Sequence, residues 1–559
     1  MIAYKKIAIT RLSLLFFSAG NAEHLLRERV YLQTDKETYL AGEWVWIKLL
    51  TTDIQGIPLS VSKVGYVELF DENAAHSQIK IELQEGVGQG CIELPATLST
   101  GNYRLVGYTR YMRNEGEDCF FEKNIGIVNT FIADGKIELL NEPLPVPADN
   151  LPSTSIKLSS DRTGYSTRQT GILTIEHLPD NIKTLSVSIA GVDPVASAPN
   201  LLQWQKGLPK GELPSFSDEI LPEYEGHIVK GKLMEIQTDR EGYANDVIPM
   251  IGFTGEQIQV FNGKLTSDSQ VCFYTTHISG TEEIVSSVFN DPDNRFRIDI
   301  ESPFVASAPS SLPPLLLYEE QKEELLQRSI GMQAAYYYTR DSLNRFLPAS
   351  PKFNWQPAWS YKLDEYTRFA NIEETVIEYV RGLRFRRIGK QRMLSAIQEN
   401  QSQFTYGNTL VLIDGIPLNN HDMIFYYDPA LVEQLDVYRG IYVFGEHFFD
   451  GIAAFKTYHN DYPGLTANKS MQFYQYAGPQ LKRCFYAPDY RLPENQNSRL
   501  PDFRHTLLWE PDVQTNGANE ISIPFQTSDL TGQFRISVEG LTQSGACVYA
   551  TLLIQTHKE

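Results

Sequence analysis

The alternation of apolar and polar residues between Arg29 and Thr130 is the feature that most constrains the fold. Short runs such as "RVYLQTD" and "VGYVELF" interleave apolar and polar residues, and Gly, Asp and Asn turns separate the runs. A period of two is typical of strands that bury one face, and short strands with turns about every ten residues form antiparallel sandwiches. This part of the chain is therefore predicted to be a β-sandwich.

The opening of this segment recurs further along the chain. Four residues match four others at a constant offset of 126: Leu32, Asp35, Lys36 and Tyr39 correspond to Leu158, Asp161, Arg162 and Tyr165. The Pro-rich, polar stretch 140–155 between the two copies has the composition of a linker. Internal similarity at a fixed spacing predicts a second, related sandwich.

Several stretches of the chain resemble known β-sandwich modules. The first copy, with "TDKETYLAGE" and "STGNYRL", resembles the macroglobulin-like (MG2-type) domain, and the C-terminal tail resembles it again. The strands between Pro222 and Pro303 resemble transthyretin-like or carboxypeptidase-regulatory sandwiches. These resemblances imply a tandem array of sandwiches.

A different pattern occupies residues 361–465. A strand ends in "LIDGIPL", a helical stretch and a Leu-x-Val strand follow, and Phe-Gly precedes a final strand. This order resembles the plug domain of TonB-dependent outer-membrane receptors. The residues that match its motif are Asp414, Gly415, Pro417, Arg439, Gly440 and Gly445.

The chain is too short after this segment to continue as such a receptor does. A barrel of about 22 strands needs more than about 200 residues, whereas 100 residues follow His459. The resemblance therefore implies a plug-like domain without its own β-barrel.

Together these patterns predict a mainly β, multidomain chain of macroglobulin-like or Ig-like sandwiches with one inserted α/β plug-like domain. The expected divisions are a signal peptide (1–22), a macroglobulin-like sandwich (23–135), a second one (150–215), a transthyretin-like sandwich (216–305), a helical connector (306–360), the plug-like domain (361–465) and a C-terminal sandwich (466–559).

Composition and the N-terminus indicate where the protein works. Lys5, Lys6 and Arg11 precede an apolar run and a small-residue cleavage site at Gly20–Ala22, which predicts an export signal. The formal charge is -20, with 69 acidic and 49 basic residues, so we expect no nucleic-acid partner. The chain has no stretch of 18 apolar residues for a membrane helix. The expected location is the periplasm, or association with the outer membrane, in a Gram-negative envelope.

Motifs for catalysis, cofactors and metals are missing from the sequence. The string from Gly90 to Leu94 lacks the Gln that a macroglobulin thioester requires, and His421-Asp422 is a pair without a third metal ligand. We therefore expect no enzymatic activity and no cofactor.

A basic stretch stands out in this acidic chain. Six cations lie within twelve residues: Arg381, Arg384, Arg386, Arg387, Lys390 and Arg392. They are interpreted either as a contact for an anionic partner or lipid headgroup, or as the solvated edge of a strand whose charges prevent aggregation.

The first functional hypothesis is a non-enzymatic envelope protein that docks with, or occludes, an outer-membrane barrel protein. The alternative is a macroglobulin-type protease inhibitor or trap without a thioester, and a third class is an envelope hydrolase or carbohydrate-binding module. The sequence names no small-molecule ligand.

Overall fold

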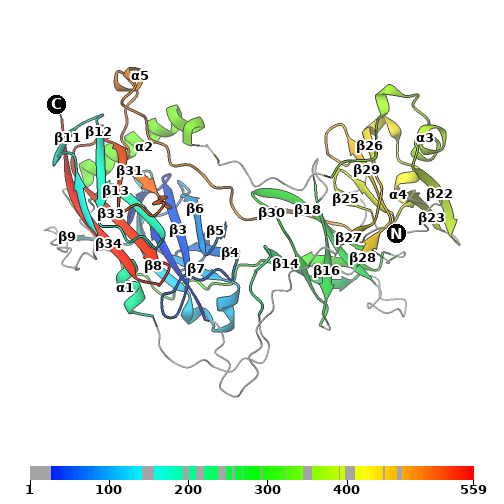
Figure 1. The fold of residues 1–559 in the computed structure, drawn as a ribbon, viewed down its shortest axis with the longest axis horizontal. Coiled ribbons are helices and arrows are strands. Elements are labelled where there is room, and N and C mark those ends of the chain that lie inside the picture. The colour runs from blue at the N-terminus through cyan, green and yellow to red at the C-terminus, as the bar shows by residue number, and fades with distance from the viewer. Residues whose placement is uncertain are drawn as a thin grey trace, which may run out of the picture.

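The computed structural model describes residues 27–140, 156–192, 200–208, 220–236, 247–254, 259–266, 268–289, 291, 294–319, 321–343, 346, 355–388, 391–396, 409–418, 420–444, 447–462 and 469–558. The predicted signal peptide, Lys390 and Gly445 lie outside these residues. Figure 1 shows an elongated molecule with a pair of β-sandwiches at one end, an α/β unit at the other and a smaller sandwich between them.

The first sandwich is continuous in sequence and folds as expected. One sheet has the order β1-β3-β6 and the other β2-β8-β7-β4-β5, with β2 and β8 parallel. The strands are β1 (Glu28–Thr34), β2 (Thr38–Leu40), β3 (Trp44–Asp53), β4 (Val64–Phe70), β5 (Ala75–Glu82), β6 (Val87–Glu93), β7 (Gly101–Thr109) and β8 (Phe121–Val128). Its inward residues form one apolar core that includes Tyr39, Ile47, Val67 and Leu105.

The second sandwich is assembled from two distant parts of the chain. Its sheets have the orders β10-β12-β32 and β11-β34-β33-β13-β31, which match the first sandwich strand for strand, including the parallel pair β11 and β34. The strands are β10 (Lys157–Ser160), β11 (Gly164–Ser166), β12 (Thr170–Glu176), β13 (Ile182–Gly191), β31 (Thr506–Glu510), β32 (Glu520–Gln526), β33 (Gly532–Thr542) and β34 (Cys547–His557).

This arrangement corrects two of the expected divisions. Residues 150–215 and 466–559 are not separate sandwiches, because β12 pairs with β32 along its whole length and β13 pairs with β33. Each half offers its apolar face only to the other half, so neither has a core alone. The shared core contains Tyr165, Ile175, Val187, Phe525 and Ile536.

The repeated residues form the same corner in both sandwiches. The Asp35 carboxylate accepts hydrogen bonds from the Tyr39 hydroxyl (2.8 Å) and the Trp46 amide (3.1 Å). The equivalent Asp161 accepts from the Tyr165 hydroxyl and the Ile172 amide, both at 2.7 Å. The constant offset in sequence therefore marks a structural repeat.

The middle sandwich also borrows a strand from the predicted C-terminal domain. Its order is β19-β14-β17-β16-β15-β18-β30, with strands β14 (Ile228–Glu235), β15 (Ile248–Phe253), β16 (Gln259–Leu265), β17 (Gln270–Tyr274), β18 (Thr281–Phe289), β19 (Phe296–Ile300) and β30 (Gln472–Ala477). Because β30 pairs with β18 over six residues, the expected boundary at residue 305 leaves out one edge strand.

The α/β unit has a mixed sheet of its own with the order β21-β26-β29-β24-β25. Both faces of this sheet are covered: α3 and the hairpin β22–β23 cover one face, and the middle sandwich and the hairpin β27–β28 cover the other. Its elements are β21 (Trp359–Lys362), α3 (Ile372–Tyr379), β22 (Leu383–Ile388), β23 (Gln391–Ala396), β24 (Leu410–Ile413), β25 (Ile416–Pro417), α4 (Asp422–Phe425), β26 (Val432–Tyr438), β27 (Tyr442–Phe444), β28 (His447–Phe449) and β29 (Ile452–Thr457). Burial on both faces explains why β24 is apolar throughout rather than alternating.

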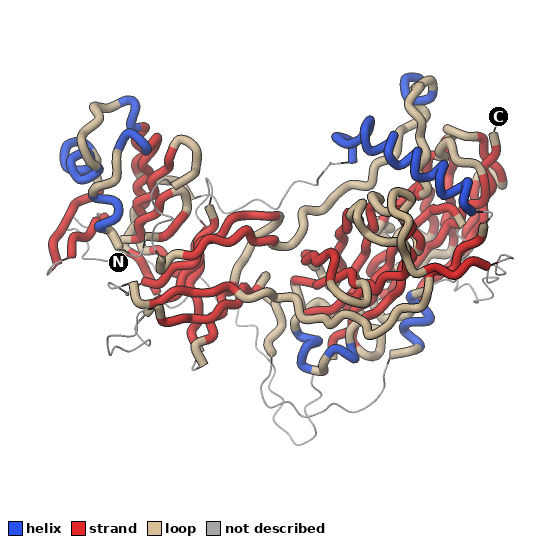
Figure 2. The backbone as a smooth tube through the Cα atoms, turned by 180° about the vertical axis from the view of Figure 1, so that it is seen from behind, coloured by secondary structure: helices blue, strands red, loops and turns tan. Residues whose placement is uncertain are grey.

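The connections between these units run along the first sandwich, as Figure 2 shows. Residues 301–314 are extended rather than helical, which corrects the start of the expected helical connector, and only the later part forms a long helix. The remaining elements are α1 (Leu201–Lys206), β9 (Ile137–Leu140), which pairs in parallel with β20 (Leu315–Tyr318), α2 (Gln321–Leu343) and α5 (Pro493–Gln496).

The helix α2 is fastened to the first sandwich by a buried ion pair. The Arg328 guanidinium contacts the Glu43 carboxylate at 2.9 Å and donates to the Thr38 carbonyl at 2.9 Å. The inserted part of the chain is thereby held against the sandwich pair.

Candidate docking surface

The Asp-Gly corner of the plug-like motif is an internal support. Asp414 is fully buried with φ of 49°, and its carboxylate accepts hydrogen bonds from the amide and hydroxyl of Thr457 (2.7 and 2.6 Å) and from the amide of Tyr462 (3.0 Å). A buried carboxylate that accepts three hydrogen bonds fixes the groups around it. Asp414 thus ties the end of β29 to the turn between β24 and β25.

The next residues of the motif face the middle sandwich. Gly415 has φ of 84°, which glycine adopts without strain. Pro417 packs on β15 so closely that a Cβ added at Gly252 would collide with its Cδ. The corner is therefore a contact between two parts of this chain and is not open to solvent.

The remaining motif residues lie beyond the far end of β26. The Arg439 guanidinium lies 5.0 Å from the centre of the Trp359 ring, a cation–π contact. Gly440 has φ of 106°, a conformation that favours glycine. The plug-like motif residues that the structure describes therefore shape the unit and do not gather into one site.

The basic stretch forms a hairpin at the end of the molecule farthest from the sandwich pair (Figure 1). Leu383 and Leu394 point into the core of the α/β unit. Arg384 and Arg387 on β22 are exposed, and Arg381, just before the strand, is exposed as well. The structure therefore leaves three of the predicted cations exposed at this hairpin.

Arg392 has an internal role instead. Its guanidinium contacts the Glu373 carboxylate at 2.8 Å and lies 4.6 and 4.7 Å from the ring centres of Phe425 and Tyr426. A side chain held by a carboxylate and two rings supports the hairpin on α3 and α4. The prediction of Arg392 as a partner contact does not fit these internal contacts.

The hairpin is attached to the unit by two further hydrogen bonds. The amide of Leu394 donates to Nδ1 of His421 (3.0 Å), and the amide of Ala396 donates to the hydroxyl of Thr409 (2.9 Å). Burial lowers the pKa of His421 to about 4, so the ring is neutral and able to accept at pH 7. His421 therefore has a structural role.

Sequence reasoning missed a second hairpin, β27–β28, on the other face of the sheet. Phe444 and Phe449 pack inward, whereas the cross-strand pair Val443 and Phe448 is 71% and 54% exposed and Ile441 is 63% exposed. The signal for it was present, because apolar residues occupy both alternating positions of "IYVFGEHFF".

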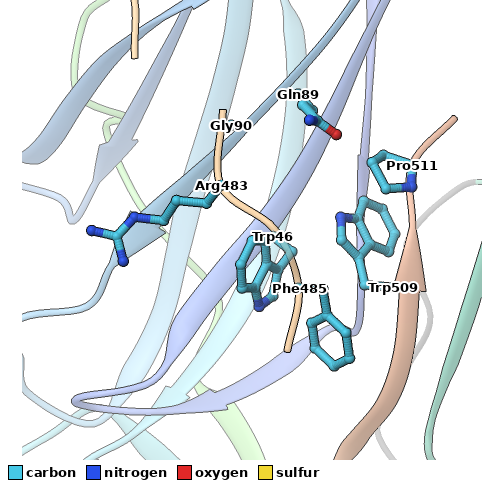
Figure 3. Close-up of a pocket in the computed structure, with 7 residues that line it drawn as sticks. All are labelled: Trp46, Gln89, Gly90, Arg483, Phe485, Trp509 and Pro511. Carbon is cyan, nitrogen blue, oxygen red and sulfur yellow. The ribbon is translucent and has the colours of Figure 1, made fainter. Parts of the chain in front are cut away.

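A small pocket lies between the two large sandwiches and the returning chain (Figure 3). It is lined by Trp46, Gln89, Gly90, Arg483, Phe485, Trp509 and Pro511. Its interior has room for about one or two water molecules. We interpret it as a packing gap, because a ligand needs far more volume.

Among the described residues, no group of three His, Cys, Asp or Glu side chains is placed to hold a metal ion. The helices in this part of the chain are all too short or too polar to cross a membrane.

Comparisons with known proteins found distant similarity to solved structures only. No family model matches the chain, and no curated protein matches it. Among solved structures, the chain is similar to *Escherichia coli* alpha-2-macroglobulin activated by porcine elastase (8% identity, TM-score 0.25, 95% of this chain and 44% of that one). It is also similar to *Salmonella* alpha-2-macroglobulin reacted with methylamine (9% identity, TM-score 0.25, 95% and 39%).

The adhesin FdeC of *E. coli* matches less of the chain, with 12% identity, a TM-score of 0.15 and coverage of 52% and 66%. The chain spans less than half the length of the two alpha-2-macroglobulins. TM-scores this low say nothing about activity. The structure is that of a mainly β, multidomain chain of β-sandwiches with an inserted α/β unit.

Proposed function

We propose that this chain is a non-enzymatic protein of the Gram-negative cell envelope that docks through its α/β unit onto an outer-membrane barrel protein. The observation that carries the proposal is the α/β unit itself: it has its own sheet, it carries the Asp-Gly-x-Pro corner, and it stands at one end of the molecule (Figure 1). An end position leaves the unit accessible to a large partner.

The basic hairpin supports a contact with an acidic surface. Arg381, Arg384 and Arg387 are exposed at one hairpin of a chain whose net charge is -20. A cluster of one sign on a protein of the opposite sign orients encounters with a complementary partner. The sandwich pair at the other end serves in this proposal as a spacer that holds the α/β unit away from its anchoring point.

Affinity capture tests the proposal. The tagged full-length protein is incubated with detergent-solubilised outer membranes, and bound proteins are identified by mass spectrometry. We expect recovery of a β-barrel protein, and we expect the variant Arg381→Glu/Arg384→Glu/Arg387→Glu to recover roughly tenfold less, because reversed rim charges slow association.

The matched control reverses three exposed cations away from the hairpin, Lys157 and Arg162 of the second sandwich and Arg491 just before α5, as Lys157→Glu/Arg162→Glu/Arg491→Glu, with the same change in net charge. This control is expected to retain binding. Recovery of the protein without any barrel protein, or equal loss in both variants, would contradict the proposal. The protease-inhibitor alternative has a separate test: digestion of a large substrate by proteases that have been incubated with the protein.

A further inference from the structure

A buried polar cluster lies where the first sandwich meets the middle sandwich. Tyr66 on β4 and Lys80 on β5 come from the first sandwich, Glu223 and His227 come from the segment that leads into β14, and Tyr476 comes from β30. Glu223 is 0%, His227 2% and Lys80 3% exposed. We call these five residues the joint cluster.

The hydrogen bonds determine which nitrogen of His227 carries a proton. The Glu223 carboxylate accepts from the Tyr66 hydroxyl (2.9 Å), from the Ile228 amide (2.7 Å) and from Nδ1 of His227 (2.9 Å). Because a carboxylate only accepts, Nδ1 is the protonated nitrogen. Nε2 is then free to accept from the Tyr476 hydroxyl.

Lys80 joins the two sandwiches directly. Its Nζ donates to the carbonyl of Ala477 (2.6 Å) and lies 4.0 Å from the centre of the Tyr476 ring. Its backbone carbonyl accepts from the amide of Gln480 (2.8 Å). The contact between β5 and the end of β30 therefore depends on a buried amine.

The surroundings disfavour positive charge in the closed joint. Burial lowers the pKa of His227, an effect that Glu223 opposes and that Lys80 and Arg110 reinforce. Burial also lowers the pKa of Lys80 to about 7, against the attraction of Glu223. Glu28 is a further charged group near the cluster and interacts with Glu223 through space.

These donors do not form a metal site. Tyr66 and Glu223 lie at Nδ1 of His227, while Tyr476 lies at Nε2 on the opposite side of the ring. A single ion would need them on one side, so the cluster has to act through its protons.

We propose that the joint cluster makes the contact between the first sandwich and the middle sandwich sensitive to pH: opening the contact takes up protons on His227 and Lys80, so acid favours the open arrangement. Protonation of His227 adds an N–H at Nε2, so the Tyr476 hydroxyl has to stop donating to this nitrogen and turn to accept from it, and the joint then holds a second buried cation beside Lys80. Water in the open joint solvates both cations.

The sign and size follow from proton linkage. An exposed histidine has a pKa of about 6.5 and an exposed lysine about 10.4. Between pH 8 and pH 7, Lys80 is protonated in the open joint but only partly protonated in the closed joint. Below pH 6.5, His227 is protonated in the open joint and neutral in the closed joint. Opening takes up about one proton throughout this range, so the open population grows roughly tenfold for each unit of falling pH.

Hydrogen exchange of the purified full-length protein between pH 8 and pH 5.5 tests this inference. The amides of Lys63 and Gln480 donate across the joint to the carbonyls of Glu223 and Lys80, both at 2.8 Å. After correction for the intrinsic pH dependence of exchange, these two amides are expected to exchange roughly tenfold faster per pH unit. The amide of Ile536, in the core of the second sandwich, serves as an internal reference that stays protected. Small-angle scattering is expected to give a larger radius of gyration at pH 5.5.

Variants separate the two protons. Lys80→Met is expected to remove the pH dependence of hydrogen exchange at the joint between pH 8 and pH 7. His227→Gln is expected to remove the pH dependence of this exchange below pH 6.5. The control His76→Gln deletes an exposed imidazole on β5 and keeps the full dependence.

Constant protection of the Lys63 and Gln480 amides in the wild type between pH 8 and pH 5.5 would overturn the inference. An unchanged pH dependence of their exchange in both single variants would overturn it as well. The wild-type measurement decides the matter even where a variant fails to fold. Because no partner is present, the outcome is independent of the docking proposal.

Discussion

The two large sandwiches have the same strand order, yet one is continuous and the other is split by more than half of the chain. In the first, a short turn joins β4 to β5: the Asp71 carboxylate accepts from the amides of Asn73 and Ala74 (2.6 and 2.8 Å). In the second, residues 192–505 replace that turn, and the Gly191 amide still donates to the His505 carbonyl at 2.9 Å. The middle sandwich and the α/β unit are therefore an insertion at a hairpin turn.

This difference shows how little a sandwich depends on the length of one connection. The entropic cost of closing a loop grows only with the logarithm of its length. A strand pair that is well packed on both sides therefore tolerates a very long insertion. The consequence for folding is that the second sandwich has to wait for strands made at the end of the chain.

The largest expected effect comes from removing the late strands. A chain that ends at Arg504 lacks β31 to β34, so β13 loses both of its partners, β11 loses its only partner and β12 keeps only β10. We expect the second sandwich to be unfolded and the protein to aggregate, as judged by size-exclusion chromatography and by proteolysis between Ile156 and Val192.

The matched control replaces residues 192–505 with the turn sequence of the first sandwich, Asp71 to Ala74. This shortened protein is expected to be a soluble pair of sandwiches with one sharp unfolding transition. If it aggregates while the chain truncated at Arg504 stays folded, the comparison of the two sandwiches is wrong.

A smaller difference is expected at the repeated corner. Asp35 is buried and also accepts from the Thr506 hydroxyl of the second sandwich (2.6 Å), whereas Asp161 is partly exposed. We expect Asp35→Ala to lower the free energy of unfolding by about 3 kcal/mol and Asp161→Ala by about 1 kcal/mol, because unsatisfied buried donors cost more. Urea denaturation measures the free energy of unfolding of both variants. Equal losses would show that the contact of Asp35 with Thr506 between the two sandwiches does not add to the stability.

A further difference concerns one pair of neighbours in the core. Val45 lies opposite Ile92 in the first sandwich, and the equivalent Gly171 lies opposite Phe525 in the second. A Cβ added at Gly171 would collide with the Phe525 ring. We expect Gly171→Val to cost about 2 kcal/mol through overpacking.

The double variant Gly171→Val/Phe525→Ile restores the pair found in the first sandwich and is expected to recover more than half of that loss. Phe525→Ile alone leaves a cavity and serves as the third corner of the cycle. Additive effects of the two substitutions would show that the neighbours do not compensate each other.

Local patterns were predictable because they rest on residues close together in sequence. The corner of Asp35 and Tyr39, its repeat and the turn at Asp414-Gly415 each depend on contacts within a few residues or on alternation along one strand. The pairing of β12 with β32 was not predicted, because a strand's pattern shows which face is buried and not which partner covers it. A signal existed: "TGQFRIS" in the tail resembles "TGNYRLV" in the second half of the first sandwich.

At the candidate docking surface, too, the local sequence pattern did not show which residues a side chain contacts. The sequence marked six cations, but the contacts of Arg392 with Glu373, Phe425 and Tyr426 separate it from the exposed Arg384 and Arg387. The joint cluster left no pattern at all, since Tyr66, Glu223 and Tyr476 are far apart along the chain.

By itself the amino-acid sequence determined the period-two strands, the repeated corner and an α/β segment that interrupts the sandwiches, because hydrophobic periodicity and turn chemistry act locally. Tertiary structure alone decided that two distant segments complete one sandwich and that a strand from the tail closes another. It also decided which charges are exposed, because long-range pairing and burial depend on the whole set of apolar faces that need a partner.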